Sequence, residues 1–311
     1  MRTITITLFT VLTYFSFGQQ RVNHFESTYF EQQRFAHRGG YAIGPENTLQ
    51  TILLNLYSGV NAIEIDVHLT KDNELILFHD YTVNRLLDTD SEKAINEFTL
   101  EELKHIPLRD SSQGVQYVCS LAELIDTLVV LVPARETLNF LLEVDFKPNG
   151  KKTKAAVNAL LDILAHHSKD LGERIYNYFF ISTFYPNVLK EIQRRDPKIK
   201  TAFAVNNVPN EHKLKAKMAV ALSPFFIKKY GAAIIEPNMC MVTKRFVKKW
   251  HRRGIMINTY TANTSCDKDY LEGFPIAYTT NCPLSACIPD PSDELGRPKR
   301  WCKSCSAKID E

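Results

Sequence analysis

The sequence has little net charge and no long hydrophobic run outside its first residues, and both absences narrow the possible functions. Lysine and arginine total 38 and aspartate and glutamate 35, so the formal net charge is only +3 over 311 residues. This balance gives no electrostatic basis for binding nucleic acid, which requires a basic stripe or patch. The densest basic run, at 244–253, has helical spacing and is interpreted as a solvated helix face. We find no internal repeat and no low-complexity block.

The longest apolar stretch lies at the N-terminus. It starts after Met1-Arg2 and covers about 14 residues, fewer than the about 20 that a bilayer-spanning helix needs. Ser16-Phe17-Gly18 then places small residues at the two positions that a signal peptidase reads. Residues 1–18 are therefore predicted to be a cleaved signal peptide of a secreted or periplasmic protein, with an uncleaved anchor as the alternative. No other segment is long and apolar enough to predict a stable membrane span.

The seven cysteines fit an oxidising compartment, and they do not require a disulfide-built fold. Hydrophobic residues make up 44% of the chain, which is enough for a full-sized core. Four cysteines cluster near the C-terminus, at Cys282, Cys287, Cys302 and Cys305. The last two have the spacing of half a zinc site, but no matching pair lies upstream, so disulfides that hold the tail are favoured. Residues 289–311, rich in proline, charge and cysteine, are predicted to be a tail.

Short apolar runs rich in β-branched and aromatic residues alternate with amphipathic helical patterns. This alternation indicates parallel strands joined by crossover helices. Eight strands close a (β/α)₈ barrel of roughly 250 residues. The sequence therefore predicts an α/β fold, a (β/α)₈ TIM barrel over residues 30–288. The expected strands are 34–37, 62–67, 138–146, 178–183, 201–205, 232–236, 255–260 and 276–279, and the helices are 47–58, 152–167, 186–195, 212–229 and 243–253.

Two segments do not fit the alternation. The apolar run 75–79 follows the second strand after only Lys71-Asp72-Asn73, too short for a parallel crossover, so it is predicted to be an antiparallel hairpin strand. Residues from about 86 to 137 then interrupt the series, with helical patterns at 98–106 and 120–132. We expect a small inserted subdomain over the barrel mouth, between the second and third barrel strands.

Acidic residues recur on one face of two expected barrel strands. Side chains alternate along a strand, so Glu64 and Asp66 share a face, and Glu143, Asp145 and Lys147 share another. Neighbouring buried carboxylates repel each other unless a cation lies between them. A hard divalent ion with oxygen ligands, Ca²⁺ or Mg²⁺, is the expected cation. The alternative is a structural ion-pair network neutralised by basic side chains such as Lys147.

Two histidines lie at expected strand ends, where active sites of such barrels form. His37 is the first residue of His37-Arg38-Gly39-Gly40, and His79 is the first residue of His79-Asp80. A single histidine at a strand end is more often structural, and His68 is interpreted in that way. The joint pattern is more specific than any one residue. Within forty-four residues the chain holds, in order, His37-Arg38-Gly39, Pro45-Glu46-Asn47-Thr48, Glu64-Ile65-Asp66, Thr70-Lys71-Asp72 and His79-Asp80.

This set resembles the N-terminal signature of the glycerophosphodiester phosphodiesterase family. The resemblance covers about residues 34 to 284. Beyond the signature it continues through Arg85, Phe98-Thr99-Leu100-Glu101-Glu102-Leu103, Asp145-Phe146-Lys147, Ser182-Thr183-Phe184, Glu236-Pro237-Asn238 and Tyr260-Thr261-Ala262-Asn263.

The resemblance implies a role for each matching position. It implies that His37 and His79 are the acid–base pair. The implied ligands of one divalent cation are Glu64, Asp66 and Asp145, with Glu143 as the alternative to Asp145, and the implied phosphate contacts are Arg38 and Lys147. Tyr260 stands where many members have tryptophan, on the wall that receives the glycerol or the head group. Asn281 stands where aspartate is usual.

Three functions were compared on this basis. The first is hydrolysis of a small glycerophosphodiester substrate to an alcohol and glycerol 3-phosphate. The alternative is phospholipase D-like or phospholipase C-like cleavage of (lyso)phospholipids. His79 and Asp145 are 66 positions apart, however, and the toxin-like phospholipases in general lack a long insertion here, so a water-soluble substrate is favoured. A non-catalytic barrel would have lost a catalytic residue, and none is lost. The sequence predicts neither a head-group preference nor an oligomeric state.

Overall fold

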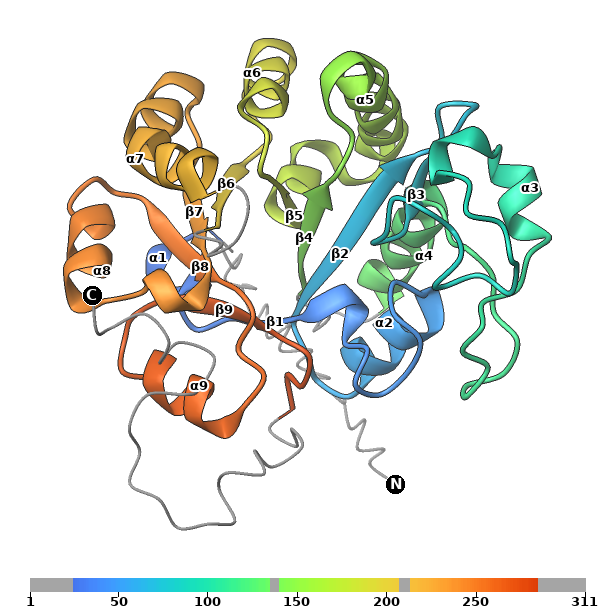
Figure 1. Cartoon of the computed structure of the whole chain (residues 1–311), viewed down its shortest axis with the longest axis horizontal. Coiled ribbons are helices and arrows are strands. Elements are labelled where there is room, and N and C mark those ends of the chain that lie inside the picture. The colour runs from blue at the N-terminus through green and yellow to red at the C-terminus, as the bar shows by residue number, and fades with distance from the viewer. Residues whose placement is uncertain (1–24, 135–139, 207–212, 285–311) are drawn as a thin grey trace, which may run out of the picture.

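Eight parallel strands form a closed ring with helices around it in the computed structural model, which describes residues 25–134, 140–206 and 213–284 (Figure 1). Each strand pairs with its neighbour along the ring, and β1 pairs with both β2 and β9, which closes it. The predicted (β/α)₈ TIM barrel is therefore confirmed. Its strands are β1 (Arg34–Ala36), β2 (Ala62–Leu69), β4 (Leu141–Phe146), β5 (Phe179–Thr183), β6 (Thr201–Val205), β7 (Ile234–Pro237), β8 (Met256–Thr259) and β9 (Ala277–Thr280).

A ninth strand, β3 (Leu75–Leu77), lies outside the barrel. It pairs antiparallel with β2, as the short connection between them predicts. Asn73 turns the chain there with a φ of 66°, a left-handed conformation that asparagine adopts more readily than most residues.

The helices lie on the outside of the strand ring (Figure 1). Two of them, α1 and α9, were not expected from the sequence. α1 has only four residues, and α9 buries a single apolar side chain, Leu271, so neither shows a helical hydrophobic period. The helices are α1 (Ser27–Phe30), α2 (Leu49–Tyr57), α3 (Leu100–Lys104), α4 (Leu121–Ala134), α5 (Thr153–Leu171), α6 (Pro186–Arg195), α7 (Lys213–Tyr230), α8 (Lys244–His251) and α9 (Ser265–Leu271).

The barrel interior is apolar at one end and polar at the other. At the end where the strands begin, Phe30 of α1 packs against Phe35 of β1 and Phe180 of β5, with ring centroids 5.9 and 5.8 Å away. These rings fill the bottom of the barrel. Toward the carboxyl ends of the strands, the buried side chains are polar, and they include Glu64, Asp66, Glu143, Ser182, Glu236 and Asn258. Such a polar layer locates the functional site at the carboxyl end.

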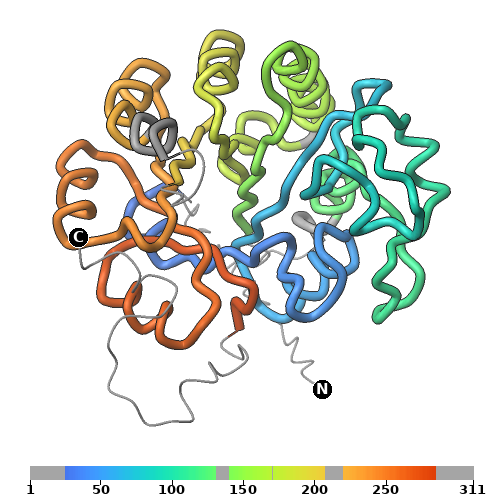
Figure 2. The backbone as a smooth tube through the Cα atoms, in the orientation of Figure 1, coloured from blue at the N-terminus to red at the C-terminus, as the bar shows by residue number. Residues whose placement is uncertain are grey.

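The segment between β3 and α4 forms a separate small core beside β2 (Figure 2). Its buried residues run from Ile76 to Val118. α4 falls within the predicted insertion of about 86–137, yet its residues Leu121, Leu124 and Leu128 pack in the main barrel core. α4 lies there because it serves as the crossover helix that connects β2 to the parallel strand β4.

Some predictions fall on residues that the structure does not describe. They are the signal peptide at 1–18, the tail at 289–311 and the end of the insertion at 135–137. Among the helices of the described residues, none combines the length and the apolar character needed to cross a membrane.

Candidate active site

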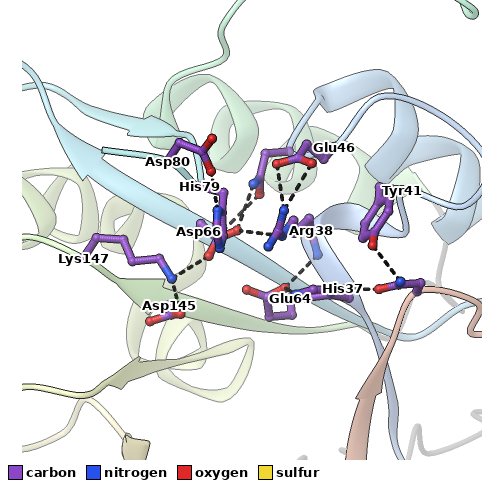
Figure 3. Close-up of polar contacts among 12 residues, drawn as sticks. His37, Arg38, Tyr41, Glu46, Glu64, Asp66, His79, Asp80, Asp145 and Lys147 are labelled. Atoms are coloured by element: carbon purple, nitrogen blue, oxygen red, sulfur yellow. Dashed lines mark hydrogen bonds and ion pairs between the residues drawn. The ribbon is translucent and has the colours of Figure 1, made fainter. Parts of the chain in front are cut away.

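A cavity of about 220 Å³ opens at the carboxyl end of the barrel, where all the predicted site residues meet. Figure 3 shows most of them converging from different strands and loops. The wall also contains Phe184 and Tyr260, whose rings meet edge to face with centroids 6.0 Å apart, and the Tyr260 hydroxyl donates to the Val205 carbonyl at 3.1 Å. The predicted residues in the lining are His37, Arg38, Glu64, Asp66, His79, Glu143, Asp145, Lys147 and Tyr260.

Three carboxylates form a compact cluster in this cavity. Glu64, Asp66 and Asp145 each offer an oxygen within 4.8 Å of the others. The parallel register of β2 and β4 produces this arrangement, because it pairs Asp66 with Asp145. The same register pairs Glu64 with Glu143, but Glu143 accepts a hydrogen bond from Asn258 Nδ2 at 2.7 Å and stays outside the cluster.

Two basic residues compensate part of this negative charge. Lys147 Nζ lies 2.8 Å from Asp66 Oδ1 and 2.5 Å from Asp145 Oδ2, and Arg38 Nε lies 3.8 Å from Asp66 Oδ2. The Arg38 backbone N–H also donates to Glu64 Oε2 at 2.7 Å. The compensation is incomplete. Burial, reinforced by the charges of Asp66 and Asp145, raises the pKa of Glu64 well above its ordinary value.

The donor set of the cluster fits a hard divalent cation. Its ligand atoms are all carboxylate oxygens, which Ca²⁺ and Mg²⁺ prefer. Asp145 Oδ1 is buried and accepts no hydrogen bond, an uncommon state for a carboxylate oxygen. A purely structural ion-pair network with Lys147 leaves this oxygen without a partner, whereas a cation between the three carboxylates provides one.

Asn47 fixes the position of Asp66, one of these carboxylates, by two hydrogen bonds. Its Nδ2 donates to Asp66 Oδ2 at 2.9 Å, and its Oδ1 accepts from the Asp66 backbone N–H at 3.1 Å. Asn47 adopts a left-handed φ of 55° to reach this position. Sequence reasoning gave it no role, although its motif Pro45-Glu46-Asn47-Thr48 was recognised.

His37 is placed by a sharp turn that follows β1. Arg38, Gly39 and Gly40 all have positive φ, at 51°, 81° and 91°. A Cβ on Gly40 would lie only 2.3 Å from Asn55 Nδ2, so the turn needs glycine there both for its conformation and for space.

The turn directs the His37 ring between a neutral hydrogen-bond partner and the acidic cluster. His37 Nδ1 lies 2.7 Å from Asn281 Oδ1, so Nδ1 carries the proton, and Nε2 faces Glu64 Oε2 at 4.0 Å. Asn281 in turn donates to the Tyr41 hydroxyl at 2.7 Å. Burial lowers the pKa of His37 to about 4, which keeps the ring neutral at ordinary pH.

His79 has a charged partner instead. Its Nδ1 lies 2.6 Å from Asp80 Oδ1, and Arg85 donates to both oxygens of Asp80, at 2.5 and 2.8 Å. The hydrogen bonds from Arg85 lower the pKa of Asp80 to about 2. Arg85 also donates twice to Glu46, at 3.0 and 2.7 Å, and Glu46 accepts from Arg38 Nη1 at 3.1 Å. One chain of ion pairs, through Asp80, Arg85 and Glu46, thus connects His79 with Arg38. Figure 3 shows its two ends, the pair of His79 with Asp80 and the pair of Glu46 with Arg38.

Below the cluster lies a second layer of polar side chains, of which Glu143 was the alternative ligand and Ser182, Glu236 and Asn258 were given no role from the sequence. Ser182 donates to Glu236, and Asn258 donates to Glu143. Burial raises the pKa of Glu236 to about 7. Strand alternation was the available signal, since these residues occupy inward positions. His68, interpreted as structural, is buried with Nε2 3.2 Å from the His79 carbonyl oxygen.

The chain is similar to known glycerophosphodiester phosphodiesterases. The chain is 28% identical over 275 residues to glycerophosphodiester phosphodiesterase 1 of Bos taurus, which covers 82% of this chain and 79% of the bovine protein. It is 28% identical over 194 residues to a glycerophosphodiester phosphodiesterase of Caldanaerobacter subterraneus, covering 61% and 74%.

Solved structures share the fold. A phosphodiesterase from Oleispira antarctica, in complex with the product sn-glycerol-3-phosphate, superposes with a TM-score of 0.64 at 22% identity, covering 83% of this chain and 96% of that one. A glycerophosphodiester phosphodiesterase from Agrobacterium tumefaciens gives a TM-score of 0.60 at 18% identity, covering 81% and 96%. The family model of the glycerophosphoryl diester phosphodiesterases matches residues 37–277. This match extends from the first catalytic candidate to the last barrel strand, and the chain belongs to the glycerophosphoryl diester phosphodiesterase family.

Proposed function

We propose that this protein hydrolyses glycerophosphodiesters to an alcohol and glycerol 3-phosphate, with His37 and His79 as the acid–base pair. The observation that carries the proposal is convergence: two imidazoles, three carboxylates and two cationic side chains line one cavity at the carboxyl end of the barrel. The glycerol 3-phosphate bound to the Oleispira antarctica relative supports the same product here.

The proposed cofactor is one divalent cation, Ca²⁺ or Mg²⁺, held by Glu64, Asp66 and Asp145. When bound, such an ion acts as a Lewis acid toward a phosphoryl oxygen. Arg38 and Lys147 line the same cavity and would neutralise the charge that develops on the other phosphoryl oxygens. Burial of the site strengthens both interactions, because charges interact more strongly away from bulk water.

The partners of the two histidines support different roles. His37 is neutral, and its Nδ1 is held by the Asn281 amide, so Nε2 is available to accept a proton from the attacking group. In the family mechanism this group is the neighbouring hydroxyl of the substrate's glycerol; its attack expels the alcohol and forms a cyclic phosphate, which water then opens to glycerol 3-phosphate. As general acid, His79 would donate its Nε2 proton to the leaving alkoxide while its Nδ1 stays hydrogen-bonded to the Asp80 carboxylate. We therefore propose His37 as the general base and His79 as the general acid.

The acid–base roles are tested by release of glycerol 3-phosphate in a coupled assay. His37→Ala and His79→Ala should each lower turnover by at least ~10²-fold, the usual contribution of a positioned acid or base. His105→Ala is the matched control, because the His105 side chain is 73% exposed on the surface. Near-normal turnover of either site variant contradicts the mechanism. An assay of lysophosphatidylcholine beside glycerophosphocholine distinguishes the proposed activity from the phospholipase alternative.

We also propose that the protein is secreted or periplasmic, with the first 18 residues removed. Cys240 and Cys266 are both disulfide-bonded, which suits an oxidising compartment. N-terminal sequencing of the exported protein should find Gln19 first. A product that stays in the membrane fraction and begins at Met1 would instead support the uncleaved anchor.

A further inference from the structure

We propose that a second cavity beside His79 is the subsite for the head group of the substrate, and that it favours a quaternary ammonium group such as choline. The inference rests on the proposed function, since it concerns the same reaction. The cavity measures about 430 Å³. Its lining residues are His79, Asp80, Tyr81, Thr82, Asp145, Lys147, Phe184 and Tyr185.

The position of this cavity beside His79 indicates which part of the substrate occupies it. It shares His79, Asp145, Lys147 and Phe184 with the catalytic cavity, so the two cavities lie side by side. If His79 protonates the leaving alkoxide, the leaving oxygen must lie next to its ring. The remainder of the leaving alcohol, which is the head group, then extends into the space on the far side of His79.

Aromatic side chains make up much of the wall of the subsite. Tyr81 follows the catalytic segment directly, and Phe184 and Tyr185 follow the end of β5. Tyr81 is 55% exposed and Phe184 is 38% exposed, so ring surface is available to a ligand. The edge-to-face contact of Tyr81 with His68, at 5.1 Å between centroids, fixes the position of its ring.

The polar groups of the lining already have hydrogen-bond or ion-pair partners in the protein. The hydroxyls of Tyr81 and Tyr185 are hydrogen-bonded at 3.0 Å, and the Thr82 hydroxyl donates to Asn84 at 2.9 Å. The Asp80 oxygens accept from His79 and Arg85. Lys147 contacts the two aspartates of the acidic cluster.

Such a lining matches a cation that makes no hydrogen bonds. A quaternary ammonium is attracted to aromatic faces and needs no hydrogen-bond acceptor. A primary ammonium must lose strongly held water, and an inositol ring brings hydroxyls that require partners of their own. The pairing of the polar groups therefore favours choline over ethanolamine and inositol.

The test compares kcat/KM for glycerophosphocholine, glycerophosphoethanolamine and glycerophosphoinositol, with glycerol 3-phosphate as the common product. The wild-type protein should prefer the choline substrate. Tyr81→Leu and Tyr185→Leu should each reduce the choline-to-ethanolamine ratio by about 2- to 30-fold, the range of a cation–π contact. Tyr81→Phe keeps the ring and should keep the ratio. Tyr57→Leu, at a tyrosine that is 48% exposed on α2, is the matched control.

Inhibition by a free quaternary ammonium ion provides a second test of the subsite. Tetramethylammonium should inhibit hydrolysis of glycerophosphocholine competitively in the wild-type protein, and more weakly in Tyr81→Leu. An unchanged ratio in both leucine variants, or a preference for inositol, overturns the subsite while leaving the proposed function intact. If no substrate releases glycerol 3-phosphate, the proposed function itself is contradicted, and the subsite with it.

Discussion

Replacing Asp80 with asparagine removes the negative charge beside His79 and leaves the size of the side chain unchanged. The two Asp80 oxygens accept from His79 Nδ1 at 2.6 Å, from Arg85 Nε at 2.5 Å and from Arg85 Nη2 at 2.8 Å. Asparagine has one acceptor oxygen. Its amide NH₂ must therefore face either the arginine or the imidazole, and facing the imidazole forces the proton onto Nε2.

The magnitude follows from the hydrogen bonds that are lost. A hydrogen bond to a charged group contributes about 1.5–3 kcal/mol, and each 1.36 kcal/mol of barrier is a factor of ten in rate. Asp80→Asn should therefore lower kcat by about 10- to 150-fold. KM should change less, because Asp80 acts through His79 on the transition state.

The assay is steady-state release of glycerol 3-phosphate, accompanied by thermal unfolding to show that the variant is folded. Asp88→Asn is the matched control, since Asp88 is 66% exposed and pairs only loosely with Arg109, at 3.5 Å. The control should behave as the wild-type protein does. If Asp80→Asn keeps kcat within twofold of the wild type, the claim that Asp80 positions His79 for proton transfer is refuted.

Three further predictions concern the groups that support the site. Gly40→Ala should lower the free energy of unfolding by about 2 kcal/mol or more in a urea titration, because its Cβ would lie 2.3 Å from Asn55 Nδ2 at a φ of 91°; unchanged stability contradicts this. Asn281→Ala should reduce kcat by about 10- to 100-fold with little change in KM, since His37 loses its orienting partner; an unaltered kcat excludes that role. Asn47→Ala should weaken divalent-cation binding by about 10- to 100-fold in calorimetry, the usual effect of losing a residue that hydrogen-bonds a metal ligand. Wild-type affinity would disprove this role.

The fold was predictable because its signals are local. Each barrel strand is a short apolar run between helical patterns, and the length of the connection alone distinguished β3 from the parallel strands. α9 was missed because its seven residues bury little apolar surface. Its beginning is marked by the capping box of Thr264 and Asp267, a signal that was present in the sequence.

The identities of the site residues were also predictable, but their partners were not. Strand alternation placed Asp66 and Asp145 on inward faces, yet alternation alone cannot separate Asp145 from Glu143, two residues earlier on the same face. The two residues differ in their depth in the barrel: Asp145 lies in the layer of the acidic cluster, and Glu143 lies in the layer below it. The contact of Asn281 with His37 joins residues 244 positions apart, so it depends on closure of the whole barrel.

The central claim is that three carboxylates hold a divalent cation that the reaction requires. Glycerol 3-phosphate release should be measured before chelation, after chelation, and after adding back Mg²⁺ or Ca²⁺. We expect chelation to abolish release and one of the two ions to restore it, while Glu64→Gln should not recover with either ion. Full activity in the presence of chelator would contradict the account.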